Sequence, residues 1–133
     1  MIDTRGEKPV VLVADRANVR LQTLDLQGNP IAQFGRENLR HPCHFDLLPN
    51  GDLLIPDLHG RVTIFDKDNQ LVAHLGDNPG IEKEKGYPNL PQDTWKADKF
   101  ISPHSACWDR RGDLYVVEWI RIGRITKLKH MNV

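Results

Sequence analysis

The sequence predicts an all-β fold made of three repeated units, and two observations support this prediction. Short motifs recur along the chain: Phe34-Gly35 returns as Leu75-Gly76 after 41 positions, and Asn50-Gly51-Asp52 returns as Arg111-Gly112-Asp113 after 61. The segments between the motifs are short, alternate between polar and apolar residues, and lack the periodicity of an amphipathic helix. A period of ~40–45 residues with several short strands in each repeat is typical of β-propeller blades.

The second repeat, residues 39–76, contains a complete set of predicted strands. Asn50-Gly51 favours the positive φ angles of a tight hairpin turn, and Lys67-Asp68-Asn69-Gln70 forms a second turn. The expected strands are residues 43–48, 53–56, 61–65 and 71–75. Four antiparallel strands joined by short turns make one blade.

The flanking repeats follow the same plan. The first repeat, about 1–38, has expected strands at 10–15, 20–25 and 31–35, and the third, about 100–133, has them at 104–109, 114–119 and 124–128. Residues 2–6 match residues 108–112, so Met1 falls inside the first strand of its repeat. The sequence therefore predicts about three, four and three strands.

Three blades do not close a ring, because propellers have ~4–8 blades. An open arc exposes the apolar faces of its terminal blades, and such surfaces cause association. Two copies related by a two-fold axis would give six blades, so we expect a homodimer that completes one ring. The alternative is that the chain is a piece of a longer six-bladed protein.

Composition excludes several classes of partner. Lys+Arg and Asp+Glu both number 18, so the net charge is zero and no basic field favours nucleic acid. No run of ~18 apolar residues is present, so no membrane span is expected. Residues 1–7 have no apolar signal segment, which predicts a cytoplasmic chain as it stands, or an exported one if it belongs to a longer protein. Cys43 and Cys107 are expected to be reduced thiols.

An insert at residues 77–99 separates the second repeat from the third. It contains Tyr87, Trp95 and three of the nine prolines, Pro79, Pro88 and Pro91. A long loop of this composition is either a binding loop for a ligand or protein partner, or a cover that packs on the neighbouring blade or subunit.

The repeat resembles the NHL-repeat family of six-bladed propellers, in particular its C-terminal half. The stretches that carry the resemblance include Val13-Ala14-Asp15-Arg16, Phe34-Gly35, Asn50-Gly51-Asp52-Leu53, Phe100-Ile101-Ser102-Pro103-His104, Gly112-Asp113-Leu114-Tyr115-Val116-Val117-Glu118-Trp119 and Gly123-Arg124-Ile125-Thr126-Lys127-Leu128. It covers nearly the whole chain apart from the insert. Because propellers host many functions, the resemblance implies a fold but no particular activity.

A similarity to one relative, the peptidyl-hydroxyglycine amidating lyase, implies candidate chemistry. That propeller holds zinc through histidines in a Pro-His-Ser context with arginines nearby; Pro103-His104-Ser105 matches the first motif, and Ala14-Asp15-Arg16 matches the arginine motif. The resemblance thus makes His104 a candidate metal ligand and Arg16 a candidate ligand-binding residue. The position that corresponds to His104 in the second repeat is Cys43, a candidate thiolate ligand.

Other candidates lie near the same rim. His41 and His44 look like a chelating pair, but three residues apart on an extended strand they point to opposite faces. Asp15, Asp57 and Glu118 are equivalent positions after the second strand of each repeat. They either accept hydrogen bonds from backbone and from Arg20, Arg61 and Arg124, or form a ring of carboxylates that could bind a cation such as calcium.

These observations favour a non-enzymatic binding or scaffold module that self-assembles into a ring and offers a small-ligand or metal site at its channel. Its candidate binding residues are His104, Arg16, Cys43, His44 and Glu118. The alternatives are an enzyme of the lyase or hydrolase type with a zinc or calcium ion in the channel, and a fragment with no independent function.

Overall fold

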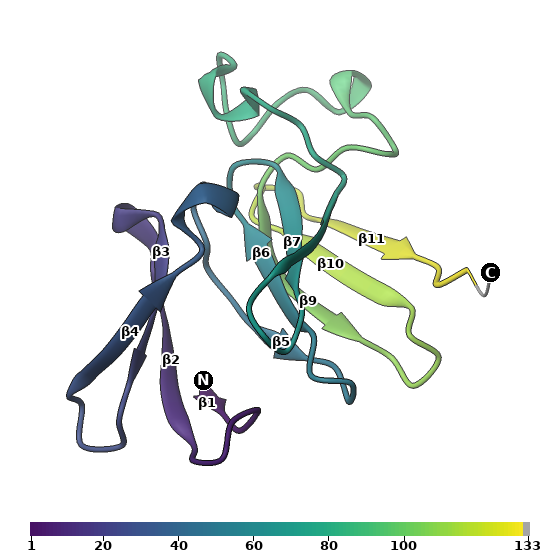
Figure 1. Cartoon of the computed structure of the whole chain (residues 1–133). Coiled ribbons are helices and arrows are strands. Elements are labelled where there is room, and N and C mark those ends of the chain that lie inside the picture. The colour runs from purple at the N-terminus through teal and green to yellow at the C-terminus, as the bar shows by residue number, and fades with distance from the viewer. Residues whose placement is uncertain (132–133) are drawn as a thin grey trace.

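The computed structural model of the chain describes residues 1–131; the last two residues of the third predicted repeat, Asn132 and Val133, lie outside the described residues. The chain forms three antiparallel sheets that follow one another in sequence and lie side by side (Figure 1). The described residues contain no α-helix, only four 3-10 turns, η1 to η4. In this part of the chain, no helix has the length and apolar character needed to cross a bilayer.

Within each sheet the strands pair in chain order. Sheet 1 contains β1 (Ile2–Asp3), β2 (Val10–Asp15), β3 (Arg20–Leu24) and β4 (Pro30–Phe34). Sheet 2 contains β5 (Asp46–Leu47), β6 (Leu53–Asp57), β7 (Arg61–Phe65) and β8 (Leu71–Leu75). Sheet 3 contains β9 (Pro103–Trp108), β10 (Leu114–Glu118) and β11 (Arg124–Leu128).

The strand predictions are confirmed with two differences. The first repeat has four strands rather than the three expected, because residues 2 and 3 pair with Val11 and Val10 as the short strand β1. The expected strand at 43–48 is reduced to Asp46–Leu47 and an isolated bridge between Pro42 and Asp57.

Pro56 explains the shortened strand. It lies in β6, and its carbonyl faces the first-strand side, where it accepts a hydrogen bond from the Cys43 amide at 3.1 Å. Proline has no N–H, so Pro56 cannot donate a backbone hydrogen bond back to the first strand. The backbone pairing between the two strands is therefore interrupted at this residue. The equivalent position in sheet 3 is Val117, which has an N–H, and β9 is continuous from Pro103 to Trp108.

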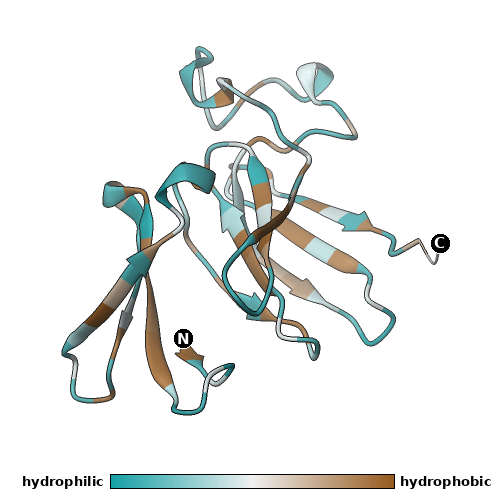
Figure 2. Cartoon of the chain, viewed as in Figure 1, coloured by the Kyte–Doolittle hydropathy of each residue, from teal (hydrophilic) through white to brown (hydrophobic). Residues whose placement is uncertain are grey.

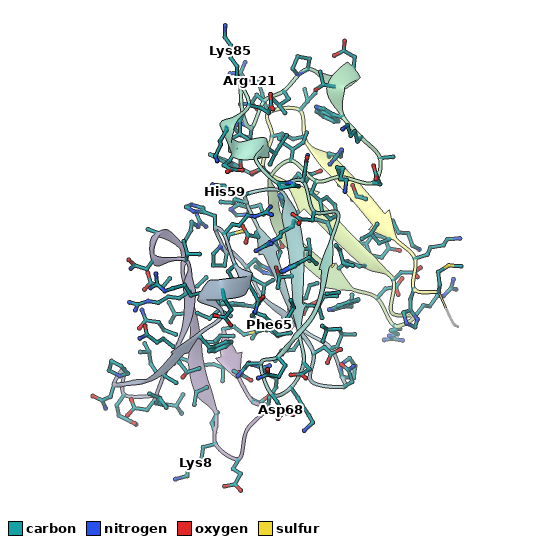
Figure 3. The ribbon with its side chains drawn as sticks, turned by 45° about the horizontal axis from the view of Figure 1, so that its top comes forward. Lys8, His59, Phe65, Asp68, Lys85 and Arg121 are labelled. Atoms are coloured by element: carbon teal, nitrogen blue, oxygen red, sulfur yellow. The ribbon has the colours of Figure 1, made fainter. Side chains whose placement is uncertain are left out.

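The core consists of side chains from facing sheets. Between sheets 1 and 2, Leu12 and Leu21 pack against Leu53, Ile55 and Phe65, which are almost fully buried; Figure 3 labels Phe65. A second cluster joins sheets 2 and 3 and contains Leu54, Val62, Ile64, Phe100, Ala106, Leu114 and Val116. Every residue of β6 and β7 is buried, so sheet 2 is covered on both faces.

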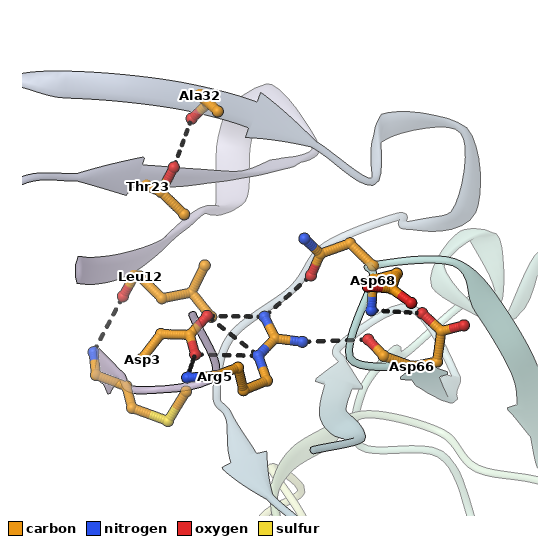
Figure 4. A network of polar contacts seen from close by, with 9 residues as sticks. Asp3, Arg5, Leu12, Thr23, Ala32, Asp66 and Asp68 are labelled. Carbon is orange, nitrogen blue, oxygen red and sulfur yellow. Dashed lines mark hydrogen bonds and ion pairs between the residues drawn. The ribbon is translucent and has the colours of Figure 1, made fainter. Parts of the chain in front are cut away.

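A polar network ties the start of sheet 1 to sheet 2 at one end of the core (Figure 4). The Arg5 guanidinium pairs with Asp3 at 2.8 Å and donates to the Asp66 carbonyl at 3.2 Å and to the Asn69 side chain at 2.9 Å. Both acceptors outside sheet 1 lie in the β7–β8 turn. The network therefore fixes the loop after β1 against the neighbouring sheet.

The insert at residues 77–99 carries η3 (Ile81–Lys83) and η4 (Gln92–Thr94) and lies over one end of sheets 2 and 3 (Figure 1). Ile81 from the insert packs with Ile101 and Ile120, and Tyr87, Leu90 and Trp95 pack around them. The Arg124 guanidinium lies 5.4 Å from the centre of the Trp95 ring. These contacts match the expected covering role; whether the insert also binds a partner stays a prediction.

Candidate functional site

Two buried carboxylates hold the segments that enter sheets 2 and 3. Asp57 ends β6, and its side chain accepts hydrogen bonds from the backbone amides of Arg40 at 2.5 Å and His41 at 2.6 Å. Glu118 ends β10 and accepts from the amides of Ile101 at 2.6 Å and Ser102 at 3.0 Å. In both cases the donors lie 17 and 16 positions before the carboxylate. The two contacts are therefore repeats of one structural device.

An arginine at the start of the third strand completes each arrangement. Arg61 donates to the Asn38 carbonyl at 2.7 Å, and Arg124 donates to the Lys99 carbonyl at 2.5 Å. Arg124 also pairs with Glu118, and Arg61 lies 3.9 Å from Asp57. The carboxylate thus binds the amides of the incoming linker, and the arginine binds a carbonyl just before them. We call each carboxylate with its arginine a linker-binding pair.

The linker-binding pair of sheet 1 consists of Asp15 and Arg20, and its contacts differ. Asp15 pairs with Arg20 at 2.7 Å and accepts from the side chains of Asn18 at 2.8 Å and Gln22 at 2.6 Å. Arg20 donates to the exposed Gln33 side chain. Among the described residues, no backbone amide donates to Asp15. Its hydrogen bonds with Arg20 and Asn18 hold the pKa of Asp15 below its ordinary value.

Glu118 was a candidate binding residue, and both oxygens of its carboxylate form hydrogen bonds within the chain. One oxygen accepts the two linker amides and the other pairs with Arg124. The Glu118 side chain has no exposed surface. The Asp57 side chain is likewise buried and accepts two backbone amides. Accepting backbone hydrogen bonds was one of the two roles that the sequence left open for these carboxylates.

Cys43 bridges sheets 2 and 3 as a protonated thiol. Its Sγ lies 3.4 Å from the carbonyl oxygens of Pro56 and Pro103 and 3.2 Å from that of His104, all of which are acceptors. Burial raises the pKa of Cys43 to about 12. A thiol in such a setting is a weak metal ligand, because metals bind the thiolate.

His104 and His44, the other candidates from the inner strands, both have exposed side chains. The His44 Nδ1 lies 3.5 Å from the Ser105 hydroxyl, so it reaches the strand that carries His104. Arg16 is also exposed and lies in η1, directly after β2. The structure thus places His44 beside the His104 strand, whereas the Glu118 side chain is buried.

A pair of histidines that the sequence did not bring together lies at the rim beneath the insert. The rings of His41 and His59 stack with centroids 4.6 Å apart and planes at 15°; Figure 3 labels His59. One oxygen of Asp57 accepts both of their backbone amides, which holds the two backbone segments close together. Tyr87 of the insert meets His59 edge-on, with centroids 6.3 Å apart.

The environment of this pair favours the neutral form of His41. Burial, with the nearby charges of His59 and Arg16, lowers the pKa of His41. Tyr87 is fixed by hydrogen bonds of its hydroxyl with the Leu58 carbonyl and the Ser102 hydroxyl. The signal in the sequence was that His41 and His59 lie on either side of Asp57, but their stacking depends on loop geometry that no periodicity encodes.

The zinc and calcium sites stay predictions, and the structure shows the surroundings of their candidate ligands. Within residues 1–131, no group of three or more His, Cys, Asp or Glu side chains is arranged to hold a metal ion. Burial raises the pKa of the Cys43 thiol, which disfavours the thiolate form that binds zinc. Of the three carboxylates considered for calcium, Asp57 and Glu118 accept backbone amides, whereas Asp15 is bound by side chains.

A scan against protein-family models finds no matching family, and a search of the curated proteins finds no significant relative.

Replacing Glu118 by alanine should strongly destabilise the fold. The change leaves the buried amides of Ile101 and Ser102 without an acceptor and Arg124 without its partner. Breaking a buried charge-assisted network costs about 3–5 kcal/mol of unfolding free energy, measurable by urea denaturation. Asp15→Ala is the matched control, because Asp15 binds only side chains and its removal should cost clearly less. Equal losses for the two variants would contradict this account.

The two cysteines should differ in reactivity. At pH 8, Ellman's reagent should modify the exposed Cys107 rapidly and Cys43 only on unfolding, because the pKa of Cys43 is raised from 9.0 to about 12. The raised pKa also stabilises the folded state below pH 9.0, and this contribution should be lost as the pH rises toward 12. A Cys107→Ser variant isolates the Cys43 signal, and rapid modification of that variant would overturn the assignment.

Proposed function

We propose that the chain is a non-enzymatic scaffold module of the β-propeller type, in which each sheet is one blade, and that two copies associate through their open sheet faces to complete a six-bladed ring. The observation that carries the proposal is that sheet 2 is covered on both faces while sheets 1 and 3 are each covered on one. The NHL-type resemblance of the repeats supports the same arrangement.

The open face of sheet 3 carries exposed apolar side chains, with Lys127 beside Tyr115. Leu114 and Val116 of β10 pack against sheet 2, so Tyr115 and Val117 lie on the opposite face. Val117 is in register with Ile125 of β11, and these side chains are 39% and 74% exposed. Figure 2 shows hydrophobic segments on both β10 and β11. A β-branched surface of this kind is suited to packing against another sheet.

The open face of sheet 1 also carries apolar side chains, with Gln22 in register with Val13. Leu12 and Ala14 of β2 pack toward sheet 2, which leaves Val11 and Val13 on the other face. β2 is hydrophobic along most of its length in Figure 2. Valines on this face could pack on Val117 and Ile125 of a second copy as Ile55 packs on Leu12 and Leu21 within the chain.

The geometry favours a head-to-tail pair. Sheets 1 and 3 lie at the two ends of the row of sheets, and their open faces point in opposite directions (Figure 1). In a closed ring, sheet 1 of one copy therefore packs against sheet 3 of the second copy. Such heterologous contacts close when the rotation completes a circle, and otherwise continue into open assemblies. Two three-blade copies match the common six-blade ring, with both contacts related by one two-fold axis.

Light scattering on a sizing column tests the proposal. The purified chain should have a mass near twice 15.2 kDa. Ile125→Glu should weaken association by about tenfold or more, because it places an unpaired charge in an apolar contact. Leu26→Glu is the control, since Leu26 is 56% exposed in the turn after β3, outside the open faces. A monomeric parent chain, or an unchanged dimer of Ile125→Glu, would overturn the proposal.

A further inference from the structure

The insert and the segment that follows it enclose a cavity of about 290 Å³. All of its lining residues lie between Asn78 and Ile101, so one continuous stretch in the interior of the chain forms its walls. Small-molecule sites in proteins have volumes of ~300–1,000 Å³. The cavity is at the lower limit of this range, which suits a small ligand rather than a nucleotide or a folded partner.

One wall of the cavity is apolar. Ile81 and Ile101 belong to this wall and are 9% and 3% exposed. Leu90 and Trp95, which also line the cavity, pack against these two isoleucines. The small apolar cluster that holds the insert on the sheets therefore also offers a surface to the apolar part of a ligand.

Hydrogen bonds fix the walls in place. The Asn78 amide donates to the Gly60 carbonyl at 2.9 Å, and the Asn78 side chain donates to the Phe100 carbonyl at 2.9 Å. The Trp95 indole N–H donates to the Leu90 carbonyl at 3.1 Å, which joins two parts of the insert. A site that is already formed loses less free energy to ordering when a ligand binds.

The cavity has an excess of positive charge. Three lysines, Lys85, Lys96 and Lys99, line it against one acidic residue, Glu84. Within residues 1–131, the lysines that form ion pairs are Lys67 and Lys127, so the charges of the three lining lysines are not neutralised by a direct partner.

The three lysines differ in exposure. Lys85 and Lys96 are exposed, and Figure 3 shows Lys85 at the outer end of the insert, pointing away from the sheets. Lys99 is half-buried. Lys99 is therefore the lysine best suited to meet an anion inside the cavity, where a charge pair is screened less by water and salt.

Arg124 connects the cavity to the rest of the fold. Its guanidinium donates to the carbonyls of Lys96 at 3.2 Å and Lys99 at 2.5 Å, and it also pairs with Glu118. The charge of Arg124 is thus used within the chain. Its contacts hold the backbone that carries two of the lining lysines.

We infer that the cavity binds a small carboxylate whose apolar body is about the size of one aromatic ring. The carboxylate pairs with Lys99, and the body packs on Ile81 and Ile101. An aromatic body also gains from Trp95, since aromatic rings pack favourably in offset-stacked or edge-to-face arrangements. A neutral ligand would leave the lysines without a partner, and an anion without an apolar body would leave the isoleucine wall in water.

Titration with cinnamate, a ring-bearing carboxylate, tests the inference. Cinnamate added to the ¹⁵N-labelled chain at low ionic strength should shift the Trp95 indole and Lys99 amide resonances in a saturable manner. For a ligand of this size we expect a dissociation constant of about 5 mM or lower. Every lining residue comes from one chain, so the test does not require self-association.

Two further probes separate the charge from the apolar body. Cinnamamide has the same ring without the charge, and acetate has the charge without the ring. Each should bind about tenfold more weakly than cinnamate or worse. Neither comparison needs a variant to fold. Affinity for cinnamamide or for acetate equal to that for cinnamate would overturn the inference.

A pair of variants locates the charge. Lys99→Gln keeps the backbone carbonyl that Arg124 binds and should weaken cinnamate binding by about tenfold. Lys83→Gln is the matched control, because Lys83 is an exposed lysine of η3 that does not line the cavity. Its affinity should equal that of the parent chain. Absence of saturable shifts, shifts centred outside the insert, or equal affinities for the two variants would contradict the assignment.

Discussion

A carboxylate that binds two consecutive backbone amides determines how the sheets of this protein follow one another. Where the chain leaves one sheet and enters the next, it carries amides that no strand satisfies, and burying them without acceptors would cost about 1–3 kcal/mol each. Asp57 and Glu118 remove that cost, and the arginine beside each binds a carbonyl of the same linker. The register of the first strand, and with it the contact between neighbouring sheets, depends on this anchoring.

The same constraint explains the rim of the molecule. One oxygen of Asp57 binds the amides of both His41 and His59, so their backbones lie close together, and their rings stack. Tyr87 of the insert then contacts His59 and reaches the Leu58 carbonyl. Asp57 and Glu118, which the sequence offered as possible ligands, therefore serve to bind the linkers. The candidate binding residues that remain exposed are His44, His104 and Arg16.

Much of the fold could be predicted from the sequence, because its strands carry strong local signals. The Asn50-Gly51 turn and the alternation in 61–65 placed β6 and β7 within a residue of their observed bounds. The shortened first strand of sheet 2 was missed because it depends on which side the Pro56 nitrogen faces. The equivalence of Asp15, Asp57 and Glu118 and the arginines beside them could be predicted from the sequence. Which amides bind Asp57 and Glu118 could not, because backbone amides leave no residue type to recognise. The stacked histidines depend on loop geometry in the same way.

Hydrogen exchange followed by NMR tests the anchoring most directly. The account predicts that the amides of Arg40, His41, Ile101 and Ser102, although outside the long strands, exchange as slowly as the core amides of β6 and β7. Their protection should come from the buried Asp57 and Glu118 carboxylates, through bonds of 2.5–3.0 Å. Exchange at the fast rates of open loops would contradict the claim that these contacts hold the sheets in register.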